Sequence, residues 1–168
     1  YMLTRQLLPL MQPGCRIVNT VSCTYAIDRI EPDFFEKGRN GRFFRIPVYG
    51  NTKLALLLFT QELAKRIQDK GITINASDPG IVSTNMITMQ AWFDPLTDIL
   101  FRPFIKTPAQ GAATAIHLAL SNEAKDKNGC CYANCKKRNV SERIRHHTQQ
   151  KQLWDDTEIL LRQKGIRF

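Results

Sequence analysis

The sequence predicts an α/β fold, namely the carboxy-terminal part of a doubly wound parallel sheet. A strand, a helix and a second strand follow one another between residues 16 and 76, and Pro79-Gly80 then makes a turn. The chain has 168 residues, 43% hydrophobic and 23% charged, enough for one domain with a real core. We therefore expect residues 1–168 to form a single domain.

The first elements lead to a serine at one edge of the predicted sheet. Residues 3–11 have the apolar periodicity of an amphipathic helix, which Pro13-Gly14 ends. The apolar segment 16–21 predicts a strand that delivers Ser22 to its carboxyl end. Residues 28–48 are charged, aromatic and turn-rich, so we expect a long excursion that lies over a substrate site.

The following elements complete the strand, helix and strand order. An apolar run predicts a helix over residues 49–69, and residues 72–76 predict the next strand, closed by Pro79-Gly80. Thr107-Pro108, with Gln110, is typical of a helix start, and that helix extends to about residue 120. In open parallel sheets ligands bind outside the carboxyl ends of the strands, where Ser22 and Pro79-Gly80 are both expected.

Tyr49 and Lys53 are spaced so that a helix places them on one face. An ammonium group beside a phenol favours the ionised phenol, so Tyr49 is a candidate general acid or base tuned by Lys53. A serine hydroxyl brought to the same place, from Ser22, is a candidate clamp for a carbonyl oxygen. The trio Ser22, Tyr49 and Lys53 suits reduction of a carbonyl or oxidation of an alcohol.

The order and spacing of these motifs resemble the short-chain dehydrogenase/reductase family. The resemblance is carried by Arg16-Ile17-Val18-Asn19-Thr20-Val21-Ser22, by Tyr49 to Lys53 with the apolar run behind it, and by Asp78-Pro79-Gly80-Ile81-Val82-Ser83-Thr84. The long gap between Ser22 and Tyr49, the segment from Asn128 to Lys136, and Leu153-Trp154 in a last helix are most similar to the retinol dehydrogenase-like branch. The resemblance covers the chain from Leu3 to about Gly165.

The resemblance implies a Rossmann-like fold and a nicotinamide cofactor, NADP in preference to NAD. Tyr49, Lys53, Pro79, Gly80, Val82 and Thr84 are the cofactor-binding residues that it implies. The glycines never form the phosphate-binding pattern of the family, nor does its Asn-Ala-Gly segment occur. We therefore expect this chain to be the carboxy-terminal portion of a longer enzyme, without the glycine-rich βαβ half and inactive alone.

Two positions depart from the family pattern. Asp78 stands where relatives commonly carry a histidine or a small residue, and its carboxylate would oppose ionisation of Tyr49 if it lay near the reaction centre. The usual pair of serines is Val21-Ser22 here, so Ser22 is the expected clamp and Thr24 the alternative.

The resemblance implies that the apolar segment 86–106 is a substrate-binding lid. Core packing is the rival interpretation. As a lid it suits a small hydrophobic alcohol or carbonyl substrate such as a retinoid, steroid or lipid aldehyde, or peripheral contact with a membrane. We expect either a cytoplasmic location or association with the endoplasmic reticulum membrane. Helix 49–69 is a candidate surface for a homo-oligomer.

Charge and cysteine content narrow the other classes of function. Residues 125–168 supply +6 of the formal net charge of +9, but they lack interleaved aromatic residues and a nucleic-acid module, so we expect no nucleic acid partner. The five cysteines lack zinc spacing and fit reduced core thiols better than disulfides or a metal site. His117, His146 and His147 are interpreted as surface or packing residues. The alternative function is a non-catalytic interaction module.

Overall fold

The fold is a twisted sheet with helices on both of its faces. The computed structural model describes residues 1–26, 30, 34–35, 45–82 and 105–166. Within them the sheet has the order β1 (Arg16–Thr20), β2 (Thr73–Asp78), β3 (Cys131–Ala133) and β4 (Lys136–Lys137). The first three strands are parallel and β4 is antiparallel to β3. The predicted α/β class with a mainly parallel sheet is confirmed.

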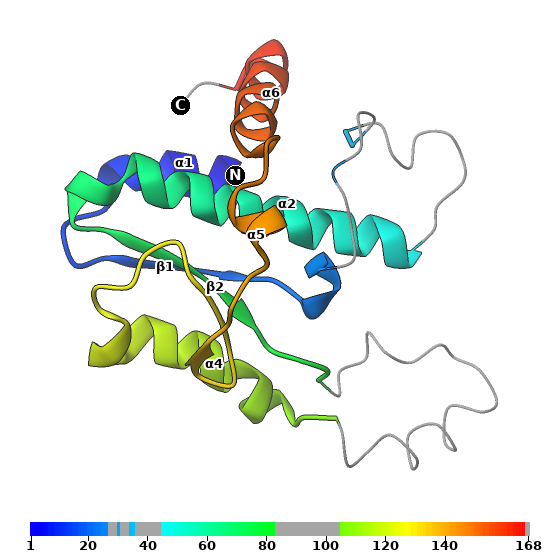
Figure 1. Ribbon diagram of the computed structural model, residues 1–168. Helices are drawn as coiled ribbons and strands as arrows, with labels where there is room; N and C mark the ends of the chain where they lie inside the picture. Colours follow the sequence, from blue (N-terminus) through cyan, green and yellow to red (C-terminus); the bar gives the residue numbers. More distant parts are fainter. Residues whose placement is uncertain (27–29, 31–33, 36–44, 83–104, 167–168) are drawn as a thin grey trace.

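Two helices enclose the sheet. Helix α2 (Arg45–Arg66) covers one face and α4 (Pro108–Leu120) covers the other, which makes the arrangement doubly wound (Figure 1). Helix α6 (Gln150–Gln163) packs on the side of α2 that faces away from the sheet, and the short α1 (Met2–Leu7) lies beside α2. Another short helix, α5 (Glu142–Arg145), and 3₁₀ turns at Leu8–Leu10, Cys23–Ala26, Gln68–Lys70 and Asn122–Ala124 complete the described elements.

The main core lies between α2 and the sheet. Leu54, Leu57 and Leu58 of α2 have no exposed surface, and each contributes about 1.5–3 kcal/mol relative to an exposed leucine. A smaller cluster under α4 joins Leu118 to Tyr132 of β3. His117 is half-buried with its ring 6.1 Å from that of Tyr132, which agrees with a packing role.

The boundaries of the elements follow local chemistry. The predicted start of α4 is confirmed, because Thr107 and Gln110 form a reciprocal capping box. The predicted helix 49–69 begins earlier, at Arg45. It ends at Arg66, before a 3₁₀ turn that Gly71 closes with a φ of +65°.

Side-chain amides hold the short strand β3 in place. Asn75 accepts a hydrogen bond from the Cys130 backbone N–H (3.0 Å) and donates to the Lys127 carbonyl (2.6 Å). Asn128 accepts from the Ile74 backbone N–H (3.0 Å) and donates to Ala64 of α2 (3.1 Å). The amides of the buried Asn75 and the half-buried Asn128 thus satisfy backbone groups that a three-residue strand leaves open.

In the described ranges no helix is long and apolar enough to cross a membrane.

Candidate functional site

Ser22 lies at the carboxyl edge of the sheet, as the sequence predicts. The parallel register pairs Thr20 of β1 with Ser77 of β2, and the Val21 backbone N–H extends the pairing by donating to the Ser77 carbonyl (2.9 Å). Ser22 follows directly and is half-buried. The Thr24 hydroxyl is buried and has no hydrogen-bond partner in the described ranges. The choice of Ser22 over Thr24 as the substrate clamp stays a prediction.

Helix α2 presents Tyr49 and Lys53 at the same edge. The Lys53 ammonium lies 5.3 Å from the centre of the Tyr49 ring and donates to the Thr20 carbonyl at 3.0 Å. Tyr49 is 36% exposed, so its phenol can meet a ligand. Because Thr20 is two residues before Ser22, Lys53 brings the pair on the helix to the end of β1.

Burial tunes Lys53. Its partial removal from water lowers the pKa of the Lys53 ammonium below its ordinary value. The Thr20 carbonyl takes one of the three ammonium protons, and two further donors remain for a ligand.

The Pro79-Gly80 turn closes β2 as predicted. The Asp78 carboxylate accepts a hydrogen bond from the Gly80 backbone N–H (2.9 Å), and Gly80 has a φ of +76°, which favours glycine. A Cβ at Gly80 would lie 3.1 Å from the ammonium nitrogen of Lys106. The turn is thus held by a carboxylate on one side and approached by a lysine on the other.

Asp78 is part of a buried ion pair. Its side chain is 3% exposed and accepts a 2.7 Å charge-assisted hydrogen bond from Arg138. The negative charge of Asp78 is therefore paired with Arg138, and its expected effect on Tyr49 stays a prediction.

The remaining candidate cofactor residues lie farther along the chain. Val82 forms an isolated parallel bridge with Lys106, and its side chain occupies the space in front of Gly111 in α4. Thr84 lies outside the described residues, as does the candidate lid 86–106 except for Ile105 and Lys106. Lys106, Asn134 and Arg138 around the turn are residues that the sequence analysis missed, because neither motif nor short spacing connects them to Gly80.

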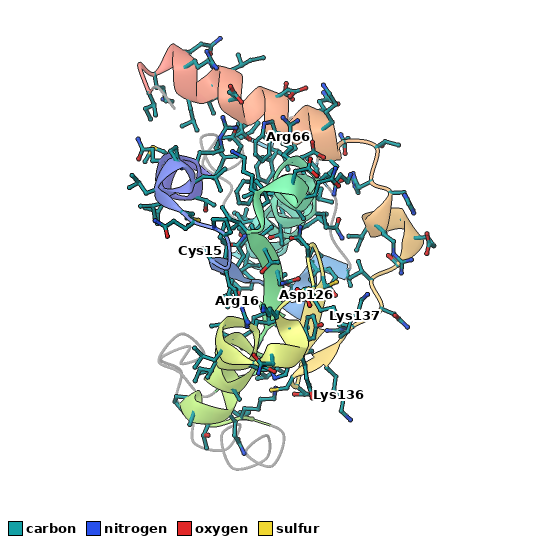
Figure 2. All side chains as sticks on the ribbon, turned by 90° about the vertical axis from the view of Figure 1, so that its left-hand side faces the viewer. Cys15, Arg16, Arg66, Asp126, Lys136 and Lys137 are labelled. Carbon is teal, nitrogen blue, oxygen red and sulfur yellow. The ribbon has the colours of Figure 1, made fainter. Side chains whose placement is uncertain are left out.

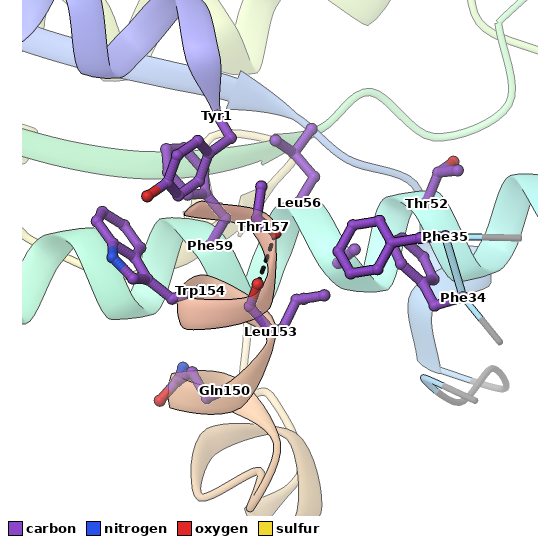
Figure 3. Close-up of a pocket in the computed structure, with 11 residues that line it drawn as sticks. Tyr1, Phe34, Phe35, Thr52, Leu56, Phe59, Gln150, Leu153, Trp154 and Thr157 are labelled. Atoms are coloured by element: carbon purple, nitrogen blue, oxygen red, sulfur yellow. Dashed lines mark hydrogen bonds between the residues drawn. The ribbon is translucent and has the colours of Figure 1, made fainter. Parts of the chain in front are cut away.

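A separate apolar pocket lies between α2 and α6, on the side of α2 away from the sheet (Figure 3). It has a volume of about 210 Å³, and most of its lining residues are aromatic or aliphatic. Tyr1, Phe59 and Trp154 lie together at one end, where the rings of Phe59 and Trp154 stack at 5.6 Å. Phe34 and Phe35 lie at the other end (Figure 3). This pocket lies apart from the Ser22 edge of the sheet.

The cysteines are free thiols in unequal environments. Only Cys131 is buried, whereas Cys15 and Cys23 are exposed, so the prediction of core thiols is wrong for those two. They flank β1 in turns and do not point into the core. In the residues that the structure describes, no three His, Cys, Asp or Glu side chains are grouped to hold a metal ion.

Comparisons with known proteins agree with this geometry. The family model described as short chain dehydrogenase matches residues 36–92. Retinol dehydrogenase 12 of Mus musculus is 36% identical over 100% of this chain and 52% of its own length, and retinol dehydrogenase 14 of Homo sapiens is 33% identical over 96% and 49%. The chain therefore spans about half the length of these curated relatives.

Solved structures share the fold. An uncharacterized protein from Mycobacterium paratuberculosis matches 95% of this chain and 54% of its own with a TM-score of 0.69 at 24% identity. A blue fluorescent protein from a metagenomic library, in complex with NADPH, matches 77% of this chain and 47% of its own with a TM-score of 0.55 at 26% identity.

The fold and the matches define the class of this protein, and the chain belongs to the short-chain dehydrogenase/reductase family. Within the family the chain is retinol dehydrogenase-like. The matches give no support to the alternative of a non-catalytic interaction module.

Proposed function

We propose that this chain carries the catalytic residues of an NAD(P)-dependent enzyme that interconverts an alcohol and a carbonyl. The observation that carries the proposal is the position of Lys53, in contact with both the Tyr49 ring and the Thr20 carbonyl at the end of β1. That position joins a proton-transfer group to the edge of the sheet where Ser22 lies. This contact supports the trio of Ser22, Tyr49 and Lys53 that the sequence predicts.

Each residue has a distinct role in this proposal. Ser22 donates a hydrogen bond to the substrate oxygen and fixes its position. Tyr49 gives a proton to that oxygen during reduction and takes it back during oxidation. The partly desolvated ammonium of Lys53 stabilises negative charge on the phenol oxygen, because electrostatic interactions strengthen as water is removed.

The residues at the site fit a nicotinamide nucleotide. Lys53 has two further ammonium protons for ribose hydroxyls. The positive φ of Gly80 favours glycine, so no side chain stands at this turn. Tyr49, Lys53, Pro79, Gly80, Val82 and Thr84 would hold the cofactor, which supplies or accepts the hydride when bound. NADPH bound to the blue fluorescent protein supports NADP in preference to NAD.

The names of the relatives and the sequence support a hydrophobic substrate class. The curated relatives are named retinol dehydrogenases, which supports a small hydrophobic alcohol or carbonyl. Segment 86–106 stays a predicted lid for such a molecule. Peripheral membrane contact and the cytoplasmic or endoplasmic reticulum location also stay predictions. A homo-oligomer through helix 49–69 would have to use surface that α6 leaves free, since α6 packs against the Phe59 end of α2.

The test is a Tyr49→Phe substitution in the full natural protein, with NADPH and all-trans-retinal or decanal as substrates. We expect kcat to fall by about 10²–10⁴-fold, the usual contribution of a positioned acid or base. Tyr132→Phe is the matched control, because it removes a phenol from β3 and should leave kcat unchanged. Undiminished turnover in Tyr49→Phe would refute the proposed role.

A further inference from the structure

A hollow with strongly positive walls opens at the carboxyl edge of β2 and β3, and we call it the basic cleft. Its volume is about 400 Å³. Four cationic side chains border it, those of Lys106, Lys136, Lys137 and Arg138, against the single carboxylate of Asp78. Part of the net positive charge of residues 125–168 therefore lies around one cleft.

Two of the four cations are already engaged. Arg138 pairs with Asp78, and the Lys106 ammonium donates to the Pro79 carbonyl (2.8 Å) and to the Asn134 side-chain oxygen (2.6 Å). These bonds hold the side chains of Arg138 and Lys106 in place at the border of the cleft.

Lys136 and Lys137 are exposed and have no hydrogen-bond or ion-pair partner in the part of the chain that the structure describes. Figure 2 shows both extending from the short strand beside α4. The cleft therefore carries the positive charge of Lys136 and Lys137, which no described carboxylate neutralises.

The hairpin that presents these lysines has a tight two-residue turn. Asn134 and Cys135 between β3 and β4 both have positive φ, 52° and 58°, although neither is glycine. Positive φ at both central residues is the usual geometry of a two-residue hairpin turn, and this turn directs Lys136 and Lys137 back along β3. The Cys135 backbone N–H donates to the Thr114 hydroxyl of α4 (3.2 Å), which anchors the turn.

The basic cleft adjoins the candidate reaction site. Cys23, which borders the cleft, follows Ser22 directly, and Gly80 of the candidate cofactor turn borders it as well. Adjacent Cα atoms are about 3.8 Å apart. A molecule whose oxygen is bound by Ser22 can thus place another of its groups in the cleft.

We propose that the basic cleft binds an acidic group, a carboxylate or a phosphate, of the alcohol or carbonyl substrate. This inference rests on the proposed function and narrows the substrate class from hydrophobic to amphiphilic, with an apolar body and an anionic end. Ammonium groups that no carboxylate neutralises attract anions into a cleft and give them charge-assisted hydrogen bonds.

The kinetic test compares decanal with 10-oxodecanoate, which has the same chain length and a terminal carboxylate. In the full natural protein, the double substitution Lys136→Gln and Lys137→Gln should raise KM for 10-oxodecanoate about tenfold, in keeping with loss of hydrogen bonds from charged donors. KM for decanal and for NADPH should not change. The matched control, Lys125→Gln with Lys127→Gln, removes the same charge from exposed residues outside the cleft and should change no KM.

A binding measurement keeps the inference testable without turnover. Decanedioate should bind the wild-type protein by isothermal titration calorimetry and bind the Lys136/Lys137 variant about tenfold more weakly. The wild-type protein could lack dehydrogenase activity and still bind decanedioate more tightly than the variant does. That result would support the anion site and contradict the proposed function. Equal decanedioate binding by both proteins would overturn the inference.

The remaining outcomes identify other sources of the anion. A rise in KM for NADPH alone would assign the cleft to cofactor phosphates and overturn the substrate assignment. The variant could also cosediment more weakly with phosphatidylserine vesicles while its kinetics with 10-oxodecanoate stay unchanged. That result would overturn the substrate assignment too, because the cleft would then bind a lipid headgroup.

Discussion

Lys53 of α2 donates a 3.0 Å hydrogen bond to the backbone oxygen of Thr20, the last residue of β1. The same ammonium lies 5.3 Å from the centre of the Tyr49 ring. One side chain thus links the helix that carries the proposed acid to the strand that carries the proposed clamp. In the proposed site, Lys53 therefore contributes position as well as charge.

Lys53→Met should lower kcat of the full natural protein on the order of 10²-fold, because both the positioning bond and the charge beside Tyr49 are lost. Lys65→Met is the control at the other end of α2, where the lysine lies 3.6 Å from Glu62, and it should leave kcat unchanged. Steady-state kinetics on both variants check this. A kcat for Lys53→Met within twofold of wild type would contradict the assignment.

The pH dependence of folding should report the burial of Lys53. Because its pKa is lowered below the ordinary 10.5, the folded protein releases this proton at lower pH than the unfolded chain does. The cost of burying the charge is then present below the folded-state pKa and is relieved as pH rises toward 10.5. Urea unfolding at pH 8 and pH 10 should show wild type gaining stability relative to Lys53→Met, and the opposite trend would disprove the desolvation argument.

Gly111→Ala should destabilise the protein, although alanine in a helix is ordinarily more favourable than glycine by about 1 kcal/mol. An added Cβ would lie 2.6 Å from Cγ2 of Val82, so Val82 or α4 must move, at a cost of about 1–3 kcal/mol. Denaturant unfolding measures the sign. The neighbouring exposed Ala112→Gly provides the ordinary propensity cost for comparison, and a stabilised Gly111→Ala variant would show that Val82 yields freely.

The buried pair of Asp78 and Arg138 should respond unequally to removal of its two partners. Arg138→Gln leaves a buried carboxylate without its cation and should cost about 3 kcal/mol. Asp78→Asn retains an oxygen for the Gly80 N–H and leaves a 41% exposed arginine that water can solvate, so the cost should be about 1 kcal/mol. Chemical denaturation of both variants decides the order, and equal costs would contradict it.

The thiols should differ in reactivity toward iodoacetamide in the native protein. Burial raises the pKa of Cys131 to about 11, and its side chain is shielded from solvent, so it should stay unmodified until the protein unfolds. Cys15 and Cys23 are exposed and should react first. Mass spectrometry of peptides after timed labelling measures the order, and early labelling of Cys131 would mean that β3 opens readily.

The sequence was informative wherever chemistry is local. Proline and glycine at 79–80 predicted the turn after β2, and Thr107 with Gln110 predicted the start of α4, because caps and turns depend on neighbouring residues. The helical spacing of Tyr49 and Lys53 placed both on one face for the same reason. Strands β3 and β4 were missed because they are only three and two residues long, too short for a periodic signal.

By itself the sequence determined the α/β class and the candidate trio of Ser22, Tyr49 and Lys53. Only the tertiary structure decided that Asp78 pairs with Arg138, 60 residues away, and that Lys106, Lys136 and Lys137 border one cleft. Their spacing along the chain carries no signal, because the parallel strands and the β3–β4 hairpin bring them together. The physical reason is that charges interact according to their distance in space. Long-range strand pairing sets that distance for these residues.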